Sequence, residues 1–159
     1  MPGPGAAERV LIIIELLIKS IEDLIMKKKA RGLRNNNPGN IRINGDLFRG
    51  EIRPSTDKSF KQFETPAYGY RAIFKILRNY HTKYALTTIR QMITRWAPER
   101  ENNTAAYIDA VSGYAGIKPD DPININDREQ MIRIVAGMSK VENGVEAVMT
   151  DVIKGWNLL

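Results

Sequence analysis

Four asparagine side chains within a polar, turn-forming stretch, residues 31–44, have the chemistry of a binding site. They belong to Asn35, Asn36, Asn37 and Asn40. Each amide offers a donor and an acceptor, which suits the hydroxyl and N-acetyl groups of a sugar. The same amides can instead bond to nearby backbone and hold a loop in shape, so both interpretations stay open. Pro38 prevents a helix from continuing through this stretch.

Catalysis by this chain would have to use carboxylates. The 159 residues contain no cysteine and a single histidine, His81. A disulfide scaffold, a thiolate metal cage, a Ser-His-Asp triad and a histidine-rich metal site are therefore poor hypotheses. We expect no metal and no organic cofactor. The length is that of one domain with a substantial core.

The chain is basic, with a net charge of +6 and a pI near 9.6. This charge predicts attraction to a polyanion, which includes nucleic acid, anionic lipid and the bacterial cell wall. The basic residues are spread along the sequence, and no known nucleic-acid-binding motif is present. Nucleic-acid binding is therefore the weakest of the functions considered, and we expect no nucleic-acid partner.

Residues 6–29 predict one long amphipathic helix, because they contain neither Gly nor Pro and are rich in Leu and Ile. Apolar residues alternate at spacings of four and three, as in a coiled-coil seam. They are Val10, Ile14, Leu17, Ile21 and Leu24. Charged residues interrupt the helix too often for a transmembrane span. We expect residues 1–30 either to pack on the rest of the chain or to form a homo-oligomer, and residues 31–159 to form the main domain.

The stretch after the asparagines predicts a small antiparallel sheet. Residues 40–44 alternate as a strand, and Asn44-Gly45 is a type I′ hairpin signal that leads into residues 46–49. Residues 50–59 are predicted to be irregular, and residues 60–63 to form a third short strand.

From Thr65 onward the pattern predicts helices, which begin near Thr65, Thr88, Thr104, Asp127 and Val145. Asn126 is the predicted cap of the fourth of these helices. The predicted fold class is α+β, a mostly helical domain with one small antiparallel hairpin or sheet, preceded by the long amphipathic helix.

Several segments, taken in order, resemble phage and bacterial proteins of the lysozyme-like superfamily, many of which are phage virion or structural proteins. A more distant resemblance is to autolysin-type glucosaminidases and lytic transglycosylases. The segments are Asn36-Asn37-Pro38-Gly39-Asn40-Ile41, Phe60-Lys61-Gln62-Phe63, residues 65–72 and Trp96-Ala97-Pro98 with the residues up to Tyr107. The resemblance covers residues 31–159, and the first of these segments is its most specific part. It implies a lysozyme-like domain that acts on the glycan strands of peptidoglycan.

The resemblance also implies where the catalytic acid lies. In lysozyme-like folds the proton donor is a Glu at the C-terminal end of a helix, facing a cleft beside the β-hairpin. Glu142 stands at the end of an apolar helix, just before Asn143-Gly144, and resembles that segment. In the relatives this helix precedes the asparagine loop, so the likeness requires a permuted arrangement. The competing interpretation is a plain helix C-cap with a solvated Glu142.

Other carboxylates are weaker candidates for the acid. Glu64 lies between the third predicted strand and the Thr65 cap, where it could face a cleft or simply favour the helix dipole. An unpermuted arrangement would place the acid on the first helix, at Glu15 or Glu22.

Three further residues are candidates for contact with sugar: Tyr68, Asn102 and Tyr107. Tyr68 could stack on a sugar face, and the resemblance places Asn102 and Tyr107 near the glycan cleft. Their structural alternatives are a core aromatic or a cap-region amide.

The sequence thus predicts a muramidase or lytic transglycosylase with a single Glu acid. It would be made in the cytoplasm and act at the bacterial cell wall or be carried in a phage particle. The alternative is a non-catalytic virion or wall-binding protein.

Overall fold

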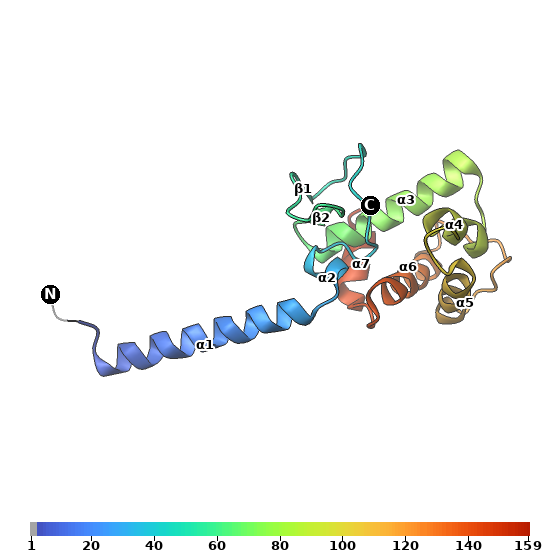
Figure 1. The fold of residues 1–159 in the computed structure, drawn as a ribbon. Helices are drawn as coiled ribbons and strands as arrows, with labels where there is room; N and C mark the ends of the chain where they lie inside the picture. Colours follow the sequence, from blue (N-terminus) through green and yellow to red (C-terminus); the bar gives the residue numbers. More distant parts are fainter. Residues whose placement is uncertain (1–2) are drawn as a thin grey trace. The chain divides into compact units, whose positions relative to one another are not determined.

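The computed structural model describes residues 3–159, which form seven helices and one two-stranded antiparallel sheet (Figure 1). The chain divides into two compact units, residues 1–30 and residues 31–159. The predicted class is confirmed: the protein is mostly helical α+β, with one small antiparallel sheet and a long N-terminal helix.

The first unit contains the single helix α1, Ala6–Lys28. Its heptad-spaced apolar residues, among them Ile14, Leu17 and Ile21, are all exposed, and no residue of α1 is buried. No described helix is long and apolar enough to cross a membrane. Self-association through this helix stays a prediction.

The core of the second unit is built from helices. These are α2 (Arg31–Arg34), α3 (Pro66–Tyr84), α4 (Ile89–Trp96), α5 (Thr104–Ala115), α6 (Arg128–Asn143) and α7 (Met149–Asn157). The long helix α3 packs mainly on α7, and α5 packs on α6. Phe74 and Leu77 of α3 are fully buried, and Phe74 meets Trp156 of α7 edge to face at 5.4 Å between ring centroids. This apolar packing holds the helices that surround the site.

Most helix starts were predicted correctly. Thr65 and Thr88 accept hydrogen bonds from the backbone N–H groups of Tyr68 and Gln91, as N-caps do. The prediction of Asn126 as a cap was wrong, because Asp127 accepts from the N–H of Gln130 and begins α6 one residue later.

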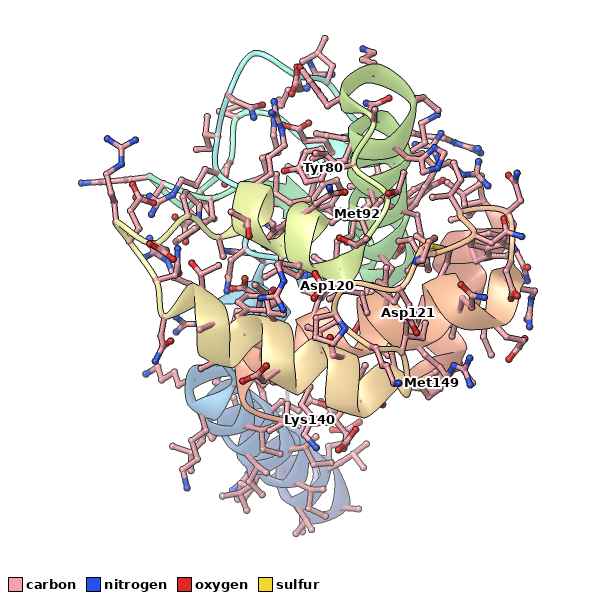
Figure 2. The ribbon with its side chains drawn as sticks, turned by 90° about the vertical axis from the view of Figure 1, so that its right-hand side faces the viewer. Tyr80, Met92, Asp120, Asp121, Lys140 and Met149 are labelled. Carbon is pink, nitrogen blue, oxygen red and sulfur yellow. The ribbon has the colours of Figure 1, made fainter. Side chains whose placement is uncertain are left out.

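The predicted start of the last helix at Val145 was also wrong, since α7 begins at Met149. Glu146 accepts a hydrogen bond from the hydroxyl of Tyr114 and pairs with Lys140, which is labelled in Figure 2. These side-chain interactions fasten residue 146 to α5 and α6 and leave residues 145–148 outside the helix.

The sheet differs from the prediction. It pairs β1 (Glu51–Ile52) with β2 (Gln62–Phe63), with Glu51 opposite Phe63. Asn44-Gly45 does not form the hairpin turn, because the side chain of Asn44 accepts the N–H of Asp46 and competes with strand pairing. Residues 40–44 contribute only a single bridge, from Arg42 to Phe60.

A buried lysine fixes the segment between this bridge and β1. Lys61 is 1% exposed, and its ammonium donates to the carboxylate of Glu51 and to the backbone carbonyl of Asp46, both at 2.8 Å. A buried charge has to be paired in this way. Residues 46–51 are thereby tied to Lys61, which directly precedes β2.

Candidate active site

The second unit contains a cleft of about 1070 Å³. One wall is formed by Gly39, Asn40 and most of residues 41–49, which follow the asparagine loop. Other walls come from α3, from the end of α4 and from four residues that follow it, Ala97, Pro98, Glu101 and Asn102. Figure 2 labels Tyr80 on α3, one of the residues that line the cleft. Glu142, at the C-terminal end of α6, lies in its lining.

Three side chains from separate parts of the chain donate hydrogen bonds to the half-buried carboxylate of Glu142. The amide of Asn40 donates to Oε2 at 2.9 Å. The hydroxyl of Tyr107 and the indole N–H of Trp96 both donate to Oε1, at 3.0 and 3.3 Å. Glu142 is therefore not a freely solvated helix-end residue, and its carboxylate is held in a fixed orientation.

The next residue fastens the end of α6 to the asparagine loop. Asn143 is buried, and its amide donates to the carbonyl oxygens of Pro38 and Ser139, both at 2.8 Å. Gly144 then takes a left-handed conformation with φ of 71° and ends the helix. Adjacent residues of α6 thus contact adjacent parts of the loop about 100 positions earlier in the sequence, Asn143 through Pro38 and Glu142 through Asn40.

Tyr107 has its hydroxyl group on Glu142 and only 6% of its surface exposed. Burial, together with the neighbouring Glu142 carboxylate, raises the pKa of the Tyr107 hydroxyl far above its ordinary value. The hydroxyl therefore stays protonated and remains a donor to Glu142 at any working pH.

Three of the four asparagines predicted to bind sugar use their side chains for hydrogen bonds to other parts of the protein. The amide of Asn37 donates to the carbonyls of Ile41 and Lys61, and its oxygen accepts the N–H of Ile41. Asn36 donates to the carbonyl of Phe63. Asn35 bonds to Asp57 and Gln62. These contacts are those of a turn-stabilising network.

Asn40 differs from the other three because it lines the cleft. Its backbone is left-handed, with φ of 48°, a conformation that asparagine tolerates better than most residues. Its amide nitrogen donates to Glu142, while its side-chain oxygen is buried and has no partner among the described residues.

The remaining predicted residues are dispersed. Asn102 is exposed and lines the cleft, with its amide 3.4 Å from the carbonyl of Pro98. Tyr68 is half-buried, lies outside the cleft lining and packs on Gly50, with the guanidinium of Arg49 at 5.7 Å from its ring. Glu64 is exposed and also lies outside the cleft lining.

Comparison with known proteins shows a phage relative. No known family model matches the chain. The chain is 40% identical over 132 residues to "Protein P5" of Pseudoalteromonas phage PM2, and the match covers 81% of each protein. The chain belongs to the Protein P5 family. A phage relationship is thereby shown.

In this member of the Protein P5 family, sequence reasoning missed several residues of the cleft. Trp96 was noted only as part of a segment that carries the family resemblance. Nothing in the sequence indicated that its indole N–H bonds to Glu142. Lys75 and Arg71, which line the cleft from α3, were seen only as scattered charges. Their spacing of four residues on a predicted helix was a usable signal, because it places both on one face.

An ion pair between Arg31 and Asp57 stabilises the beginning of the asparagine loop. Asp57 accepts two hydrogen bonds from the guanidinium of Arg31, at 2.6 and 2.7 Å, and one from the N–H of Ser59 at 2.9 Å. Arg31 and this N–H hold the pKa of the Asp57 carboxyl well below its ordinary value.

The Asp57 interaction predicts acid sensitivity. Because the folded-state pKa is depressed, the unfolded chain binds the proton first, so the stabilisation is complete above about pH 5 and is lost as pH falls through 4 and below. We expect Asp57→Asn to lower the melting temperature at pH 7, and the difference from wild type to shrink between pH 5 and pH 3. Thermal unfolding followed by circular dichroism checks this. A difference that stays constant over that range would contradict it.

Proposed function

We propose that this protein cleaves the glycan strands of peptidoglycan, as a muramidase or lytic transglycosylase, with Glu142 as the general acid. The observation that carries the proposal is the position of Glu142, half-buried in the lining of a large cleft and oriented by Asn40, Trp96 and Tyr107. A plain helix C-cap requires none of these three contacts. The resemblance of residues 36–41 to the asparagine loop of lysozyme-like proteins supplies the substrate class.

The hydrogen bonds to Glu142 support a proposal for which of its oxygens would carry the proton. A carboxylate offers about four acceptor positions. The Oε1 atom accepts from both Trp96 and Tyr107, whereas Oε2 accepts only from Asn40. The Oε2 atom therefore keeps a free position to carry the proton that passes to the leaving glycosidic oxygen.

In either reaction Glu142 acts first as an acid and then as a base, and only the lytic transglycosylase can work with this single carboxyl group. After the C–O bond breaks, the Glu142 carboxylate takes a proton from a water molecule in a hydrolase, or from the substrate's own hydroxyl in a lytic transglycosylase. The other carboxylates that line the cleft are Asp46 and Glu101. A hydrolase mechanism would require one of them to stabilise the cationic transition state or to activate water.

The predicted binding residues receive different proposed roles, according to whether they line the cleft. Asn40 and Asn102 line it. The exposed amide of Asn102 is the proposed sugar contact, whereas the amide of Asn40, which bonds to Glu142 and has a buried oxygen, is proposed to orient that carboxylate. Tyr107 is buried behind Glu142 and is proposed to position that carboxylate. Asn35, Asn36 and Asn37 are proposed to hold the loop that carries Asn40.

A non-catalytic role in a phage particle is the second candidate, and the phage relative is compatible with it. Such a protein would keep the cleft and bind glycan without turning it over. The same experiment separates the two candidates.

The test is digestion of purified peptidoglycan from several bacterial types, with mass spectrometry of the soluble products. Anhydromuramic ends would identify a lytic transglycosylase, reducing muramic ends a muramidase, and reducing glucosamine ends a glucosaminidase. Absence of soluble products, together with co-sedimentation of the protein with the wall material, would establish the non-catalytic alternative.

The role of Tyr107 gives a separate prediction. We expect Tyr107→Phe to lower kcat for wall digestion roughly tenfold, because one of the three donors to Glu142 is lost, while KM changes little. The ring still fills its buried site, so the melting temperature should stay near that of wild type. Initial rates across substrate concentrations check this, and a change confined to KM would contradict a positioning role.

A further inference from the structure

The excess positive charge of the protein is concentrated on two helices. Together α3 and α4 carry six of the 24 lysines and arginines and none of the 18 acidic residues. The rest of the chain is electrically balanced, since the net charge of the whole chain is +6. A wall of one sign inside a cleft focuses the electric field and attracts groups of the opposite sign.

The cations of α3 form a row along the cleft. Arg71, Lys75 and Lys83 all line it and are separated by multiples of four residues, which places them on one face of the helix. With a rise of about 1.5 Å per residue, the row extends for about 18 Å. Arg95 joins it from α4. The row is therefore longer than a single monosaccharide.

These cations have no acidic partner of their own. Among the described residues, none of the four forms an ion pair, whereas Arg90 of α4, outside the cleft lining, pairs with Asp120 at 2.7 Å. Arg95 instead lies over the ring of Tyr84 at 3.8 Å, and Arg71 donates to the carbonyl of Leu158. Lys75 and Lys83 have ammonium groups with no protein acceptor among the hydrogen bonds of the described chain.

The carboxylates that line the cleft come from other segments. Asp46 follows the asparagine loop, Glu101 follows α4, and Glu142 ends α6. Arg42 and Arg49 also line the cleft, and Arg42 pairs with Glu101 at 3.8 Å. The helical wall on α3 and α4 therefore carries cations alone, whereas all three carboxylates lie on the other segments. A polyanion with charge at every backbone unit, such as a nucleic acid, would meet repulsion from those carboxylates. A strand with a neutral backbone and acidic side branches matches this separation of charge.

We propose that the row formed by Arg71, Lys75, Lys83 and Arg95 binds the free carboxylates of peptidoglycan stem peptides while the uncharged sugar backbone lies beside Glu142. The assignment rests on the glycan-cleaving function proposed above and adds its specificity: the substrate is a peptide-bearing strand. Neutral glycans without acidic branches would be poor ligands.

The test measures binding and does not depend on turnover. The Glu142→Gln protein is incubated with peptidoglycan sacculi free of teichoic acid, in native form and after carbodiimide amidation of their carboxylates, and bound protein is quantified by sedimentation. We expect amidation to weaken binding several-fold. Adding Lys75→Gln and Lys83→Gln should weaken binding to native sacculi roughly fivefold and leave binding to amidated sacculi unchanged.

The control carries Lys118→Gln and Lys154→Gln, an exposed pair outside the cleft lining that changes the net charge equally. It should bind native sacculi as the Glu142→Gln parent does. Equal loss with both pairs would overturn the proposal in favour of general charge attraction, as would equal binding to native and amidated sacculi. Tighter binding of a single-stranded oligonucleotide, lost in the Lys75 and Lys83 variant, would overturn it in favour of nucleic acid. This experiment measures binding and not cleavage. Binding that depends on the carboxylates would therefore support the proposal even if the wild-type protein released no products from peptidoglycan.

Discussion

Replacing Glu142 with glutamine is expected to lower the rate of glycan-strand cleavage about a thousandfold, while the protein keeps its fold and its affinity for peptidoglycan. Loss of a general acid removes a contribution of roughly 10²–10⁴ to the rate. The amide has the size and shape of the carboxyl group but carries no proton that it can transfer to the leaving oxygen.

The surroundings of Glu142 explain why the fold should survive. In the glutamine variant, the oxygen that replaces Oε1 can still accept from Trp96 and Tyr107. The new NH₂ group then faces Asn40, whose side-chain oxygen is buried without a partner. Rotation of the Asn40 amide by 180° turns this oxygen toward the new donor, so one hydrogen bond is replaced by another.

The measurement compares turbidity loss of peptidoglycan and released fragments for wild type, Glu142→Gln and two matched variants. Glu64→Gln removes an exposed carboxylate outside the cleft lining and should keep full activity. Glu101→Gln removes an exposed carboxylate of the lining and tests whether a second acid contributes. Cleavage that persists in Glu142→Gln would remove this residue from the mechanism.

The fold was predictable wherever a local signal decides it. Caps such as Thr65 and Thr88 are set by a side chain and a backbone N–H three residues away, so they can be read from sequence. The sheet was not predictable, because the bonds that decide it depend on single side chains and follow no periodic pattern. The side chain of Asn44 accepts a hydrogen bond from the N–H of Asp46. Lys61 is buried and paired with Glu51, and this pairing could be recognised only from the folded loop.

The site was predictable only in part, for a similar reason. Glu142 was selected from a helix end and a family likeness, and its contact with Asn40 depends on packing between residues 102 positions apart. Periodicity identifies the faces of single helices and does not say which helix end meets which loop. The orienting roles of Trp96 and Tyr107 follow from that packing and from no motif.

Gly69→Ala is expected to reduce the free energy of unfolding by about 2–3 kcal/mol, the largest stability change predicted here. Gly69 lies in the first turns of α3, where the helix backbone touches the asparagine loop. A Cβ atom there would lie 2.1 Å from the backbone oxygen of Asn36 and 2.7 Å from Cδ of Pro38. Backbone atoms cannot move aside as a flexible side chain can, so either the loop or the helix has to shift.

Gly113→Ala provides the matched control, because it makes the same change inside another helix. Gly113 lies in α5 with open space around its Cα, and it is exposed. Alanine is the better helix former by about 1 kcal/mol, so this variant should be slightly more stable than wild type. Urea unfolding of both variants gives free-energy changes of opposite sign if close contact at Gly69 decides the outcome. Stabilisation by both substitutions would show that the loop moves aside for the new Cβ atom and would contradict the prediction.

The Gly69 contact also links stability to the site. The loop segment that a Cβ would push away, Asn36 to Pro38, leads directly into Asn40 and contains the carbonyl that Asn143 binds. Displacing it moves the donor of Asn40 away from Glu142 and loosens the end of α6. We therefore expect the folded fraction of Gly69→Ala to have lower cleavage activity than wild type, measured per folded molecule at low temperature. Gly113→Ala should keep wild-type activity, because Gly113 is exposed, lies outside the cleft lining and has open space for a Cβ atom.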